Sequence, residues 1–371
     1  MVRLWLPPQF DPENGTPEGE LFKARLEEFS QRRSGMRVEV RLKALSGPGG
    51  LLDSLTAAHA AAPLALPDLI LLPRGLLETA ALKGLVFPLD GSIPPLDEAD
   101  WFDYAQQLAH LQNSTFGLPF AGDALILLYR PAKITEPPKD YPASLALTGP
   151  MIFPAAQEQS YYALAQYLAA GGQVKDEEGR PILSIDVLTE VLTFFQEAEI
   201  AGVMPFWLTQ YTSDDQAWEA YAENSADLVV TWASRYLKEL PVDTAAASIP
   251  TPDGVPFTLA DGWVWALSNP QVDRHALAIE LAGFLTMSEF LADWTSAAGY
   301  LPPRSSALAD WPDTVLQNLV SRIVLSARII PTTDVLVALS PALQQATVEV
   351  LKEQNEPAIA AQEAVERVIG P

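Results

Sequence analysis

Cysteine is absent from this chain of 371 residues. The absence excludes disulfides, thiolate nucleophiles and cysteine-ligated zinc or iron–sulfur sites. Histidine is scarce as well. The three that occur lie in or at the start of predicted helices, where an exposed position is the simplest interpretation: His59, His110 and His275. We therefore predict that the protein has no metal site and needs no cofactor.

Basic side chains are few relative to acidic ones. Lysine and arginine number 23 against 47 aspartate and glutamate residues, which gives a formal net charge of −24 at pH 7. Such a surface repels phosphate backbones and anionic lipid headgroups. We therefore expect no nucleic-acid partner and no docking on a membrane surface. Hydrophobic residues make up 49% of the chain, which is enough for a sizeable core, and the length suits two or three domains or one large one.

Uninterrupted apolar stretches are also missing. The most apolar region, residues 51–72, contains Asp53, Pro63, Pro67 and Asp68 and so cannot span a bilayer. The apolar stretch at the start of the chain is too short for a signal peptide. We expect a soluble protein, and two interpretations stay open. The protein is cytoplasmic, or it is exported and its signal segment is not in this sequence.

The first 85 residues alternate between strand and helix patterns. Strand patterns occur at residues 2–6, 36–42 and 68–72, and each is followed by a helix pattern, at residues 17–33, 51–62 and 75–82. Thr16 and Pro17 suit the cap and the first position of the first helix. Apolar residues at i, i+4 and i+7 give that helix one apolar face: Phe22, Leu26 and Phe29. The order βαβαβα indicates a mostly parallel sheet with helices on both sides.

The rest of the chain is mixed up to about residue 267 and rich in helices after it. Strands are predicted at residues 115–120, 124–129, 151–153, 228–231, 245–249 and 263–267. A crossing rich in proline and glycine, residues 250–256, separates the last two strands. Helices are predicted at residues 97–111, 159–170, 186–201, 214–222, 275–285, 288–298, 314–326, 335–353 and 357–369.

No common catalytic or nucleotide-binding motif is complete. Gly47-Pro48-Gly49-Gly50 lies between a predicted strand and a helix, where a dinucleotide-binding loop would lie. The third glycine of that fingerprint is replaced by Leu52, so we interpret the segment as an ordinary strand-to-helix turn. Acidic residues near position 100 suit the start of a helix better than a metal site. No carboxylate pair can be assigned to the two sides of a hydrolase cleft.

Aromatic residues are the most informative. Several fall at predicted strand ends or in loops: Trp5, Trp101, Tyr161, Trp207, Trp232, Trp263 and Trp265. A flat aromatic ring stacks on the apolar face of a sugar ring, while neighbouring amides and carboxylates bind the hydroxyl groups. Each of these rings can equally be a core residue. The case for sugar binding therefore depends on several of them lying together.

Five stretches in the correct order carry a family resemblance that covers nearly the whole chain. They are Val2-Arg3-Leu4-Trp5, Pro67-Asp68-Leu69-Ile70, Phe116-Gly117-Leu118-Pro119-Phe120 with Gly122-Asp123, residues 226–232, and residues 261–267 with Leu301-Pro302-Pro303-Arg304-Ser305-Ser306-Ala307. The last is the most specific. The sequence resembles the extracytoplasmic solute-binding proteins of ABC importers, in the family that includes maltose-binding and other sugar-binding proteins.

The resemblance implies an α/β protein with the two-lobed fold of type 2 periplasmic binding proteins. Each lobe would be a mostly parallel sheet flanked by helices, with the ligand in a cleft between the lobes. We expect one lobe to contain residues 1–118 and 250–300 and the other to contain residues 119–249 and 301–371. The hinge crossings are expected near residues 116–124, 245–257 and 298–303. Closure about them would bury the ligand, and a membrane permease would recognise the closed form.

The resemblance also implies ligand-binding roles for particular residues. Trp232 matches the family's stacking aromatic residue, and Tyr161 matches a tyrosine that contacts the sugar ring. Asp123 matches a polar position that faces the cleft, and Gln159 lies where some sugar binders have a carboxylate. The remaining candidates are Asp261 and Trp263 in the return segment, Gln9 and Phe10 in the first loop, and Arg304, for which we favour a structural role.

The sequence departs from the maltodextrin binders at three places. Leu71-Leu72-Pro73-Arg74 stand where those proteins often have aromatic and acidic residues, Tyr129-Arg130-Pro131 replaces a common Tyr-Asn-Lys, and residues 330–339 lack a late aromatic residue. A smaller or differently decorated sugar therefore fits better than a long maltodextrin. A ligand that is not a sugar stays open.

We therefore predict a monomeric, non-enzymatic substrate-binding component of an ABC transporter, which captures a carbohydrate-like solute and delivers it to permease subunits. The resemblance implies an extracytoplasmic protein, periplasmic or anchored as a lipoprotein, whose signal segment is not in this chain. The alternative is a ligand-sensing protein, or a binder of a non-sugar solute, with the same fold. A hydrolase is a less favoured alternative.

Overall fold

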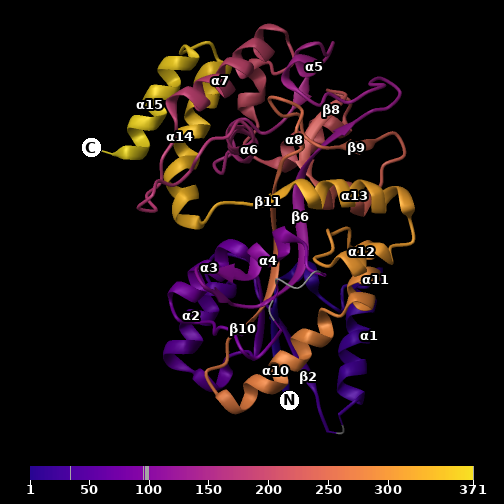
Figure 1. The fold of residues 1–371 in the computed structure, drawn as a ribbon. Coiled ribbons are helices and arrows are strands. Elements are labelled where there is room, and N and C mark those ends of the chain that lie inside the picture. The colour runs from indigo at the N-terminus through magenta and orange to yellow at the C-terminus, as the bar shows by residue number, and fades with distance from the viewer. Residues whose placement is uncertain (34, 95, 97–99, 371) are drawn as a thin grey trace. The chain divides into compact units, whose positions relative to one another are not determined.

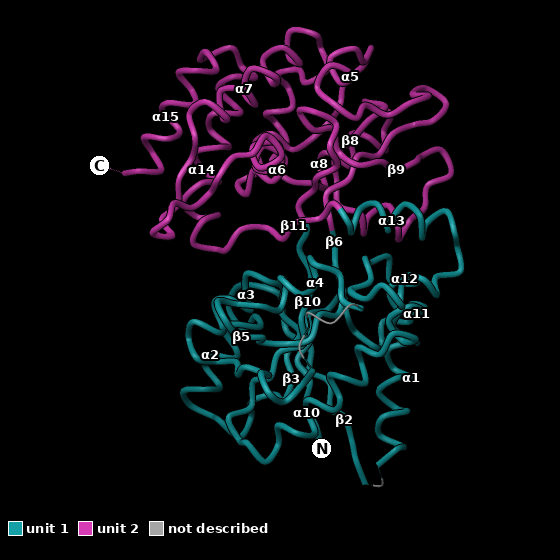
Figure 2. Tube along the Cα trace, viewed as in Figure 1, with its two compact units in different colours: residues 1–123, 260–325 teal, residues 124–259, 326–371 magenta. Residues whose placement is uncertain are grey.

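The computed structural model describes residues 1–33, 35–94, 96 and 100–370, and the chain divides into two compact units (Figures 1 and 2). Unit 1 contains residues 1–123 and 260–325, and unit 2 contains residues 124–259 and 326–371. The first division falls after residue 123 instead of 118, and the second after residue 259 instead of 249. Residues 301–325, which we predicted in the second lobe, belong instead to unit 1. The reason is that Leu301 pairs with Gly122 and Arg304 binds Asp100.

The sheet of unit 1 has the strand order β2-β1-β3-β10. β1 (Val2–Leu6) is parallel to β2 (Val38–Leu42) and β3 (Leu69–Pro73), and β10 (Thr258–Leu267) is antiparallel to β3. The helices that follow the parallel strands lie on both sides of the sheet, with α2 and α3 on one side and α1 on the other (Figure 1). They are α1 (Pro17–Gln31), α2 (Leu51–Ala61) and α3 (Arg74–Leu82). The predicted βαβαβα order is confirmed.

Helix α1 begins where local sequence signals predict. The Thr16 side chain accepts a hydrogen bond from the N–H of Gly19 at 3.2 Å, and Pro17 takes the first helical position. Its predicted apolar face is buried against the rest of unit 1: Phe22, Leu26 and Phe29. Capping and burial of one face together account for this helix.

The glycine-rich segment before α2 is a strand-to-helix turn. Gly47 and Gly49 have φ angles of +78° and +77°, in the left-handed region that glycine adopts without strain. The N–H of Gly49 donates to Oδ2 of Asp53 at 2.7 Å. In a phosphate-binding loop this N–H would donate to the ligand, but here it donates to the Asp53 carboxylate of the chain itself. The bond agrees with our interpretation of the motif as an ordinary strand-to-helix turn.

Strand β6 (Leu118–Tyr129) runs from unit 1 into unit 2 without interruption. We predicted two strands at residues 115–120 and 124–129. Gly122 does not separate them, because its N–H and C=O both pair with Leu301 at 2.8 Å. Further upstream, β5 (Ser114–Thr115) pairs with β4 (His110–Leu111). The helix predicted at residues 97–111 is the shorter α4 (Asp103–Ala109), and positions 97–99 lie outside the described residues.

Helices make up much of the remainder of unit 1: η1 (Pro8–Phe10), η2 (Pro63–Ala65), α10 (Val272–Leu285), α11 (Ser288–Ala298), α12 (Ser305–Ala309) and most of α13 (Thr314–Ser326). Arg25 joins α1 to α10. Its guanidinium lies 3.5 Å from the ring centroid of Phe284 and donates to that residue's carbonyl at 2.8 Å. Over the described ranges, no single helix is long and apolar enough to cross a membrane, although α10 and α11 meet that test as a pair bent by 61°.

We predicted a mostly parallel sheet in each lobe, but the sheet of unit 2 is mixed. β8 (Leu228–Trp232) is parallel to β7 (Met151–Ile152) and antiparallel to β6, and β9 (Ala245–Ala247) is also antiparallel to β6. The reason is the connectivity, since β6 enters unit 2 directly, without the helical crossover that makes neighbouring strands parallel. The other elements of unit 2 are α5 (Tyr141–Leu145), α6 (Tyr161–Ala169), α7 (Ile185–Ile200), η3 (Phe206–Gln210), α8 (Asp214–Ala222), α9 (Ala233–Glu239), β11 (Ala327–Ile329), α14 (Thr333–Leu351) and α15 (Pro357–Ile369).

A buried carboxylate holds three segments of unit 1 together. Asp68 is 1% exposed and accepts hydrogen bonds from the N–H of Arg3 at 2.8 Å and from Nδ2 of Asn269 at 2.9 Å. Arg274 on α10 binds it with two nitrogens, Nε and Nη2, at 2.6 Å each. These bonds connect β1, the start of β3 and α10, which are far apart in the sequence. Removal of either charge would leave the other without its partner.

We expect Asp68→Ala to lower the free energy of unfolding of unit 1 by about 3 kcal/mol, because the donors around it lose a buried acceptor. Asp68→Asn keeps an oxygen acceptor and should cost less. Urea unfolding followed by tryptophan fluorescence measures both. A loss below about 1 kcal/mol for the alanine variant would mean that this network does not hold the segments together.

Candidate ligand-binding surfaces

Two of the predicted site residues in unit 2 lie in direct contact. Trp232 is the last residue of β8 and Tyr161 is the first residue of α6. Their ring centroids are 5.5 Å apart, with an angle of 84° between the ring planes. Both side chains are only partly buried. The pair therefore presents aromatic surface to solvent at the carboxyl end of a strand, where α/β proteins commonly bind ligands.

The loop before α6 fixes the position of Tyr161. Ser160 has a φ angle of +51° and donates its N–H to the carbonyl of Gln157 at 3.0 Å. The loop is held from two other elements, since the N–H of Ala156 donates to the carbonyl of Tyr211 at 3.0 Å and Gln344 of α14 donates to the carbonyl of Ala156 at 3.2 Å. Gln159 lies in the same loop and is exposed. It is two residues from Tyr161.

A second aromatic pair in unit 2 was not assigned to the site from the sequence. Trp207 of η3 and Tyr211 meet edge to face at 5.8 Å, and both are partly buried. The carbonyl of Tyr211 accepts the bond from the loop that carries Gln159. The sequence indicated Trp207 as an aromatic residue in a loop. That its partner Tyr211 binds the loop of Gln159 could be seen only in the folded chain. The pair adds aromatic surface to the same part of unit 2.

Polar side chains fix the strand that ends at Trp232. Asp214, at the start of α8, accepts from Oγ1 of Thr231 at 3.0 Å and from Nε of Arg235 at 3.2 Å. Burial raises the pKa of the Asp214 carboxyl, and its bonds to Thr231 and Arg235 partly offset that effect. Because neighbouring strand residues point to opposite faces, Thr231 is held on one face while Trp232 is directed to the other.

Phe10 is a core residue of unit 1, which corrects our prediction that it contacts ligand. Its side chain is 2% exposed, and its ring is surrounded by other aromatic rings. The ring centroids of Trp263, Tyr300 and Trp294 lie 4.8, 5.7 and 5.8 Å from it. Trp263 and Tyr300 are partly exposed. Phe10 thus supports two rings that have surface available to a ligand, and the neighbouring Gln9 is exposed.

Asp123 lies beside Tyr300 in unit 1. Burial raises the pKa of the Tyr300 hydroxyl well above its ordinary value, and the negative charges of Asp123 and Glu18 raise it further. The pairing of Gly122 with Leu301 brings these segments together, and it requires glycine because a Cβ at position 122 would lie 2.4 Å from the hydroxyl oxygen of Tyr104. Sequence reasoning missed Tyr300, although it follows the Gly299 that ends α11.

The carboxyl group of Asp261 has a pKa that is shifted by its surroundings. Burial raises its pKa to about 6, although the N–H of Gly262, which donates to Oδ1 at 2.8 Å, and the charge of Arg74 favour the ionised form. Arg74 is itself buried and bonded to Glu78 at 2.9 Å and to the carbonyls of Leu108 and other residues at the end of α4. Asp261 therefore lies next to a charge pair that is already satisfied.

Arg304 has a structural role in unit 1. Its guanidinium donates to Oδ2 of Asp100 at 2.8 Å and to the carbonyl of Thr286 at 2.9 Å, and it lies 3.8 Å from the ring centroid of Trp101. Burial alone would raise the pKa of Asp100, but hydrogen bonds from Ser306 and Arg304 outweigh that effect and lower it to about 2. These bonds engage the guanidinium within its own unit.

Each unit thus gathers part of the predicted set. Unit 2 holds Trp232, Tyr161 and Gln159, and unit 1 holds Asp123, Asp261, Trp263 and Gln9. In the part of the chain that the structure describes, no three His, Asp or Glu side chains are grouped so that they could hold a metal ion. The exposed surfaces combine aromatic rings with carboxylates and amides. That combination suits recognition of a polyhydroxylated molecule.

Comparison with solved structures defines the class of fold. Similar structures are the cyclic α-maltosyl-1,6-maltose binding protein of Arthrobacter globiformis (18% identity, TM-score 0.81, covering 99% of this chain and 97% of that one) and the sugar-binding protein MalE of Xanthomonas citri (18%, 0.79, 99% and 96%). A cyclo/maltodextrin-binding protein in complex with maltotetraose is also similar (21%, 0.78, 99% and 96%). The protein has the α/β fold of periplasmic sugar-binding proteins, as predicted.

The family follows from the sequence itself. The model of the bacterial extracellular solute-binding proteins matches residues 24–318, and the chain belongs to this family. A search of curated proteins finds no match. The family assignment confirms the resemblance to the solute-binding proteins of ABC importers.

We expect the stability of unit 1 to depend on the protonation of Asp261. Its folded pKa of about 6 lies above the ordinary value of 3.8, so the folded state binds the proton more tightly. The resulting stabilisation is complete below pH 3.8 and is lost as the pH rises through 6. The shift corresponds to about 3 kcal/mol. Asp261→Asn imitates the protonated form, so its advantage over the wild type should grow by up to that amount between acid and neutral pH.

Chemical unfolding at several pH values, from about 4 to about 8, tests this expectation. Asp293→Asn is a matched control, because Asp293 is an exposed residue of the same unit and the charge change is identical. The control shows how much of any pH dependence comes from the loss of one carboxylate charge from unit 1. If the difference between Asp261→Asn and the wild type does not grow with pH beyond that of the control, the raised pKa is contradicted.

Proposed function

We propose that the protein is the substrate-binding component of an ABC transporter and captures a carbohydrate-like small solute. The observation that carries the proposal is the contact between Trp232 and Tyr161, two partly exposed rings 5.5 Å apart at the carboxyl end of β8. In a member of the extracellular solute-binding family, such a pair of rings can stack on the C–H face of a sugar.

We further propose that both units contribute to one ligand site. The aromatic rings of unit 2 would stack on the solute, and the polar groups of unit 1 would bind its hydroxyls through Asp123, Asp261 and Gln9, with Trp263 and Tyr300 beside them. Gln159 of unit 2 would add an amide. Closure of the units on the solute would then create the form that permease subunits recognise.

The proposed solute is smaller than a maltodextrin, or differently decorated. The end of β3 supports this view, because Leu71 and Leu72 are fully buried and Arg74 is 6% exposed and bonded to backbone carbonyls. This segment therefore offers neither an aromatic ring nor a carboxylate to a long ligand. The similar cyclo/maltodextrin-binding protein binds maltotetraose. For the present chain, that ligand only suggests which class of molecule to test.

We propose that the solute leaves the protein chemically unchanged and that the protein works outside the cytoplasm, in the periplasm or as an anchored lipoprotein. Membership of a family of extracellular binding proteins supports both points. A sensing protein with the same fold, or a binder of a non-sugar solute, would use the same surfaces. A binding screen that includes polyols, amino acids and other small polar molecules separates a binder of a non-sugar solute from a sugar binder.

The proposal is tested by a thermal-shift and tryptophan-fluorescence screen of mono- and oligosaccharides, followed by calorimetry on the hits. We expect Trp232→Ala to weaken the binding of a hit at least tenfold, which is about 1.4 kcal/mol. Trp232→Phe keeps a flat ring and should lose no more than about threefold, which is below 1 kcal/mol. The melting temperature of each unliganded variant serves as the control for folding.

Two outcomes would count against the proposal. If Trp232→Ala binds a confirmed sugar with unchanged affinity, the aromatic pair is not the ligand site. If only non-sugar solutes bind, and Trp232→Ala abolishes that binding, the site is right and the solute class is wrong.

A further inference from the structure

Strand β2 is the edge of the unit 1 sheet, and among the described residues it pairs with β1 alone. The N–H of Val2 donates to the carbonyl of Arg37, and the N–H of Lys43 donates to the carbonyl of Leu6, each at 2.8 Å. Successive residues of a strand direct their backbone groups to opposite sides. The odd-numbered residues of β2 therefore face β1. The even-numbered residues direct N–H and C=O to the free edge: Val38, Val40 and Leu42.

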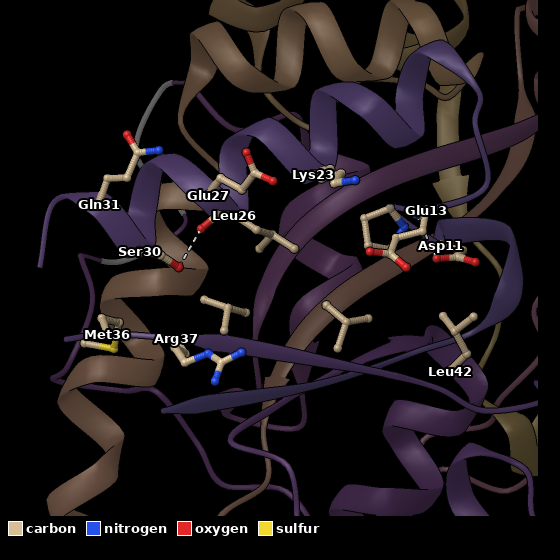
Figure 3. Close-up of a pocket in the computed structure, with 13 residues that line it drawn as sticks. Asp11, Glu13, Lys23, Leu26, Glu27, Ser30, Gln31, Met36, Arg37 and Leu42 are labelled. Carbon is tan, nitrogen blue, oxygen red and sulfur yellow. Dashed lines mark hydrogen bonds between the residues drawn. The ribbon is translucent and has the colours of Figure 1, made fainter. Parts of the chain in front are cut away.

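A groove with an apolar floor lies along this edge, between α1 and β2 (Figure 3). Its volume is about 620 Å³. Leu26 of α1 faces it from one side, and side chains of β2 and its approach face it from the other: Met36, Val38, Val40 and Leu42. Leu42 is 42% exposed. The sheet thus ends in backbone groups without a partner strand. Beside them lies a groove that has apolar side chains on its β2 side and, beside Leu26, polar or charged ones such as Lys23 and Glu27 on its α1 side.

The opposite face of β2 carries one charge of each sign. The side chains of Glu39 and Arg41 are 33% and 45% exposed and form an ion pair with each other at 2.7 Å. Arg3 of β1 lies 3.6 Å from Glu39. A free sheet edge is usually protected by charges that repel a second strand. Here the two charges stand symmetrically on either side of Val40, which allows a second copy to complement them.

We propose that β2 pairs with β2 of a second copy of this chain, in antiparallel orientation about a twofold axis at Val40. Val40 then faces its own counterpart, Val38 faces Leu42 of the partner subunit, and Glu39 faces Arg41 of the partner subunit. All N–H and C=O groups that β2 directs to its free edge would be paired in this register. The apolar side chains of both copies would lie on the face of the groove.

Charge makes this register specific. Glu39 and Arg41 occupy the positions between hydrogen-bonded pairs, where side chains of antiparallel strands approach most closely. A slip of two residues in one direction places Glu39 opposite Glu39 of the partner subunit, and in the other direction it places Arg41 opposite Arg41 of the partner subunit. Both are destabilising. A slip of one residue puts apolar side chains on the charged face.

The contact is small, so the association is weak. Each copy also carries a net charge of −24, and the resulting repulsion is long-range and falls as salt is added. We therefore expect the chain to be monomeric in dilute, low-salt solution and to dimerise at high concentration in about 0.5 M NaCl. The monomer predicted from the sequence is thus kept for dilute solution, and the proposed dimer adds a second state at high concentration. The inference does not depend on the proposed function.

Sedimentation velocity and small-angle scattering of the whole chain test the proposal in about 0.5 M NaCl. The mass should rise from 40.3 kDa towards twice that value as the concentration increases through the micromolar range. Val40→Pro should keep the protein monomeric. The N–H that proline removes points to the free edge, so the ladder with β1 is kept, and an unchanged melting temperature would verify folding.

Two charge reversals make the test specific to this register. Glu39→Arg places arginine opposite Arg41 of the partner subunit, and Arg41→Glu places glutamate opposite Glu39 of the partner subunit. Each variant alone should associate at least tenfold more weakly. The net charge changes from −24 to −22 in the first and from −24 to −26 in the second, so an effect of overall charge would move them in opposite directions. An equimolar mixture of the two should recover wild-type association.

Three results would overturn the inference. The wild type could stay monomeric at the highest concentration, which would leave the edge free for some other extended segment. Val40→Pro could dimerise like the wild type, which would locate the interface elsewhere. The mixture of charge-reversed chains could remain monomeric, which would exclude the antiparallel register centred on Val40.

Discussion

The hydrogen bonding of one strand, β6, determines where both candidate surfaces form. In unit 1, Gly122 exchanges both backbone bonds with Leu301, and this close approach sets Asp123 beside Tyr300. In unit 2, Leu125 lies opposite Trp232 in the ladder with β8. A strand must continue its ladder through successive residues. Residues 122–125 therefore determine two things. They set the position of the Asp123 carboxylate in unit 1 and the residue of β6 that Trp232 faces in unit 2.

The buried and partly buried arginines act as structural supports in a chain with few cations. Arg74 binds the carbonyls at the end of α4, Arg235 binds Asp214, and Arg304 binds Asp100. Arg74 lies near Asp261, the Asp214 bound by Arg235 also binds Thr231 beside Trp232, and Arg304 is itself a candidate residue. Each is engaged by its own unit. The surfaces that remain consist of aromatic rings, carboxylates and amides. They suit an uncharged polyhydroxylated solute better than an anionic one, because no engaged guanidinium can turn to a ligand without losing a partner.

Local sequence signals predicted most helices and strands correctly, and they failed where distant contacts decide the outcome. Thr16 and Pro17 locate the start of α1 because capping involves only neighbouring residues. β6 was predicted as two strands, at residues 115–120 and 124–129, because the bonds between Gly122 and Leu301 that continue the strand are invisible in the sequence. For the same reason, residues 301–325 were assigned to the wrong unit and the sheet of unit 2 was expected to be mostly parallel.

The sequence by itself determined the family, the alternation of strands and helices, and the acidic, cysteine-free character that excludes whole classes of function. These follow from composition, periodicity and short motifs, which do not depend on how the chain folds back on itself. Only the tertiary structure decided which aromatic residues reach a surface. Phe10 became core, Tyr300 became available, and Trp232 met Tyr161, because burial of a ring depends on neighbours that are brought together by hydrogen bonds and packing between distant segments.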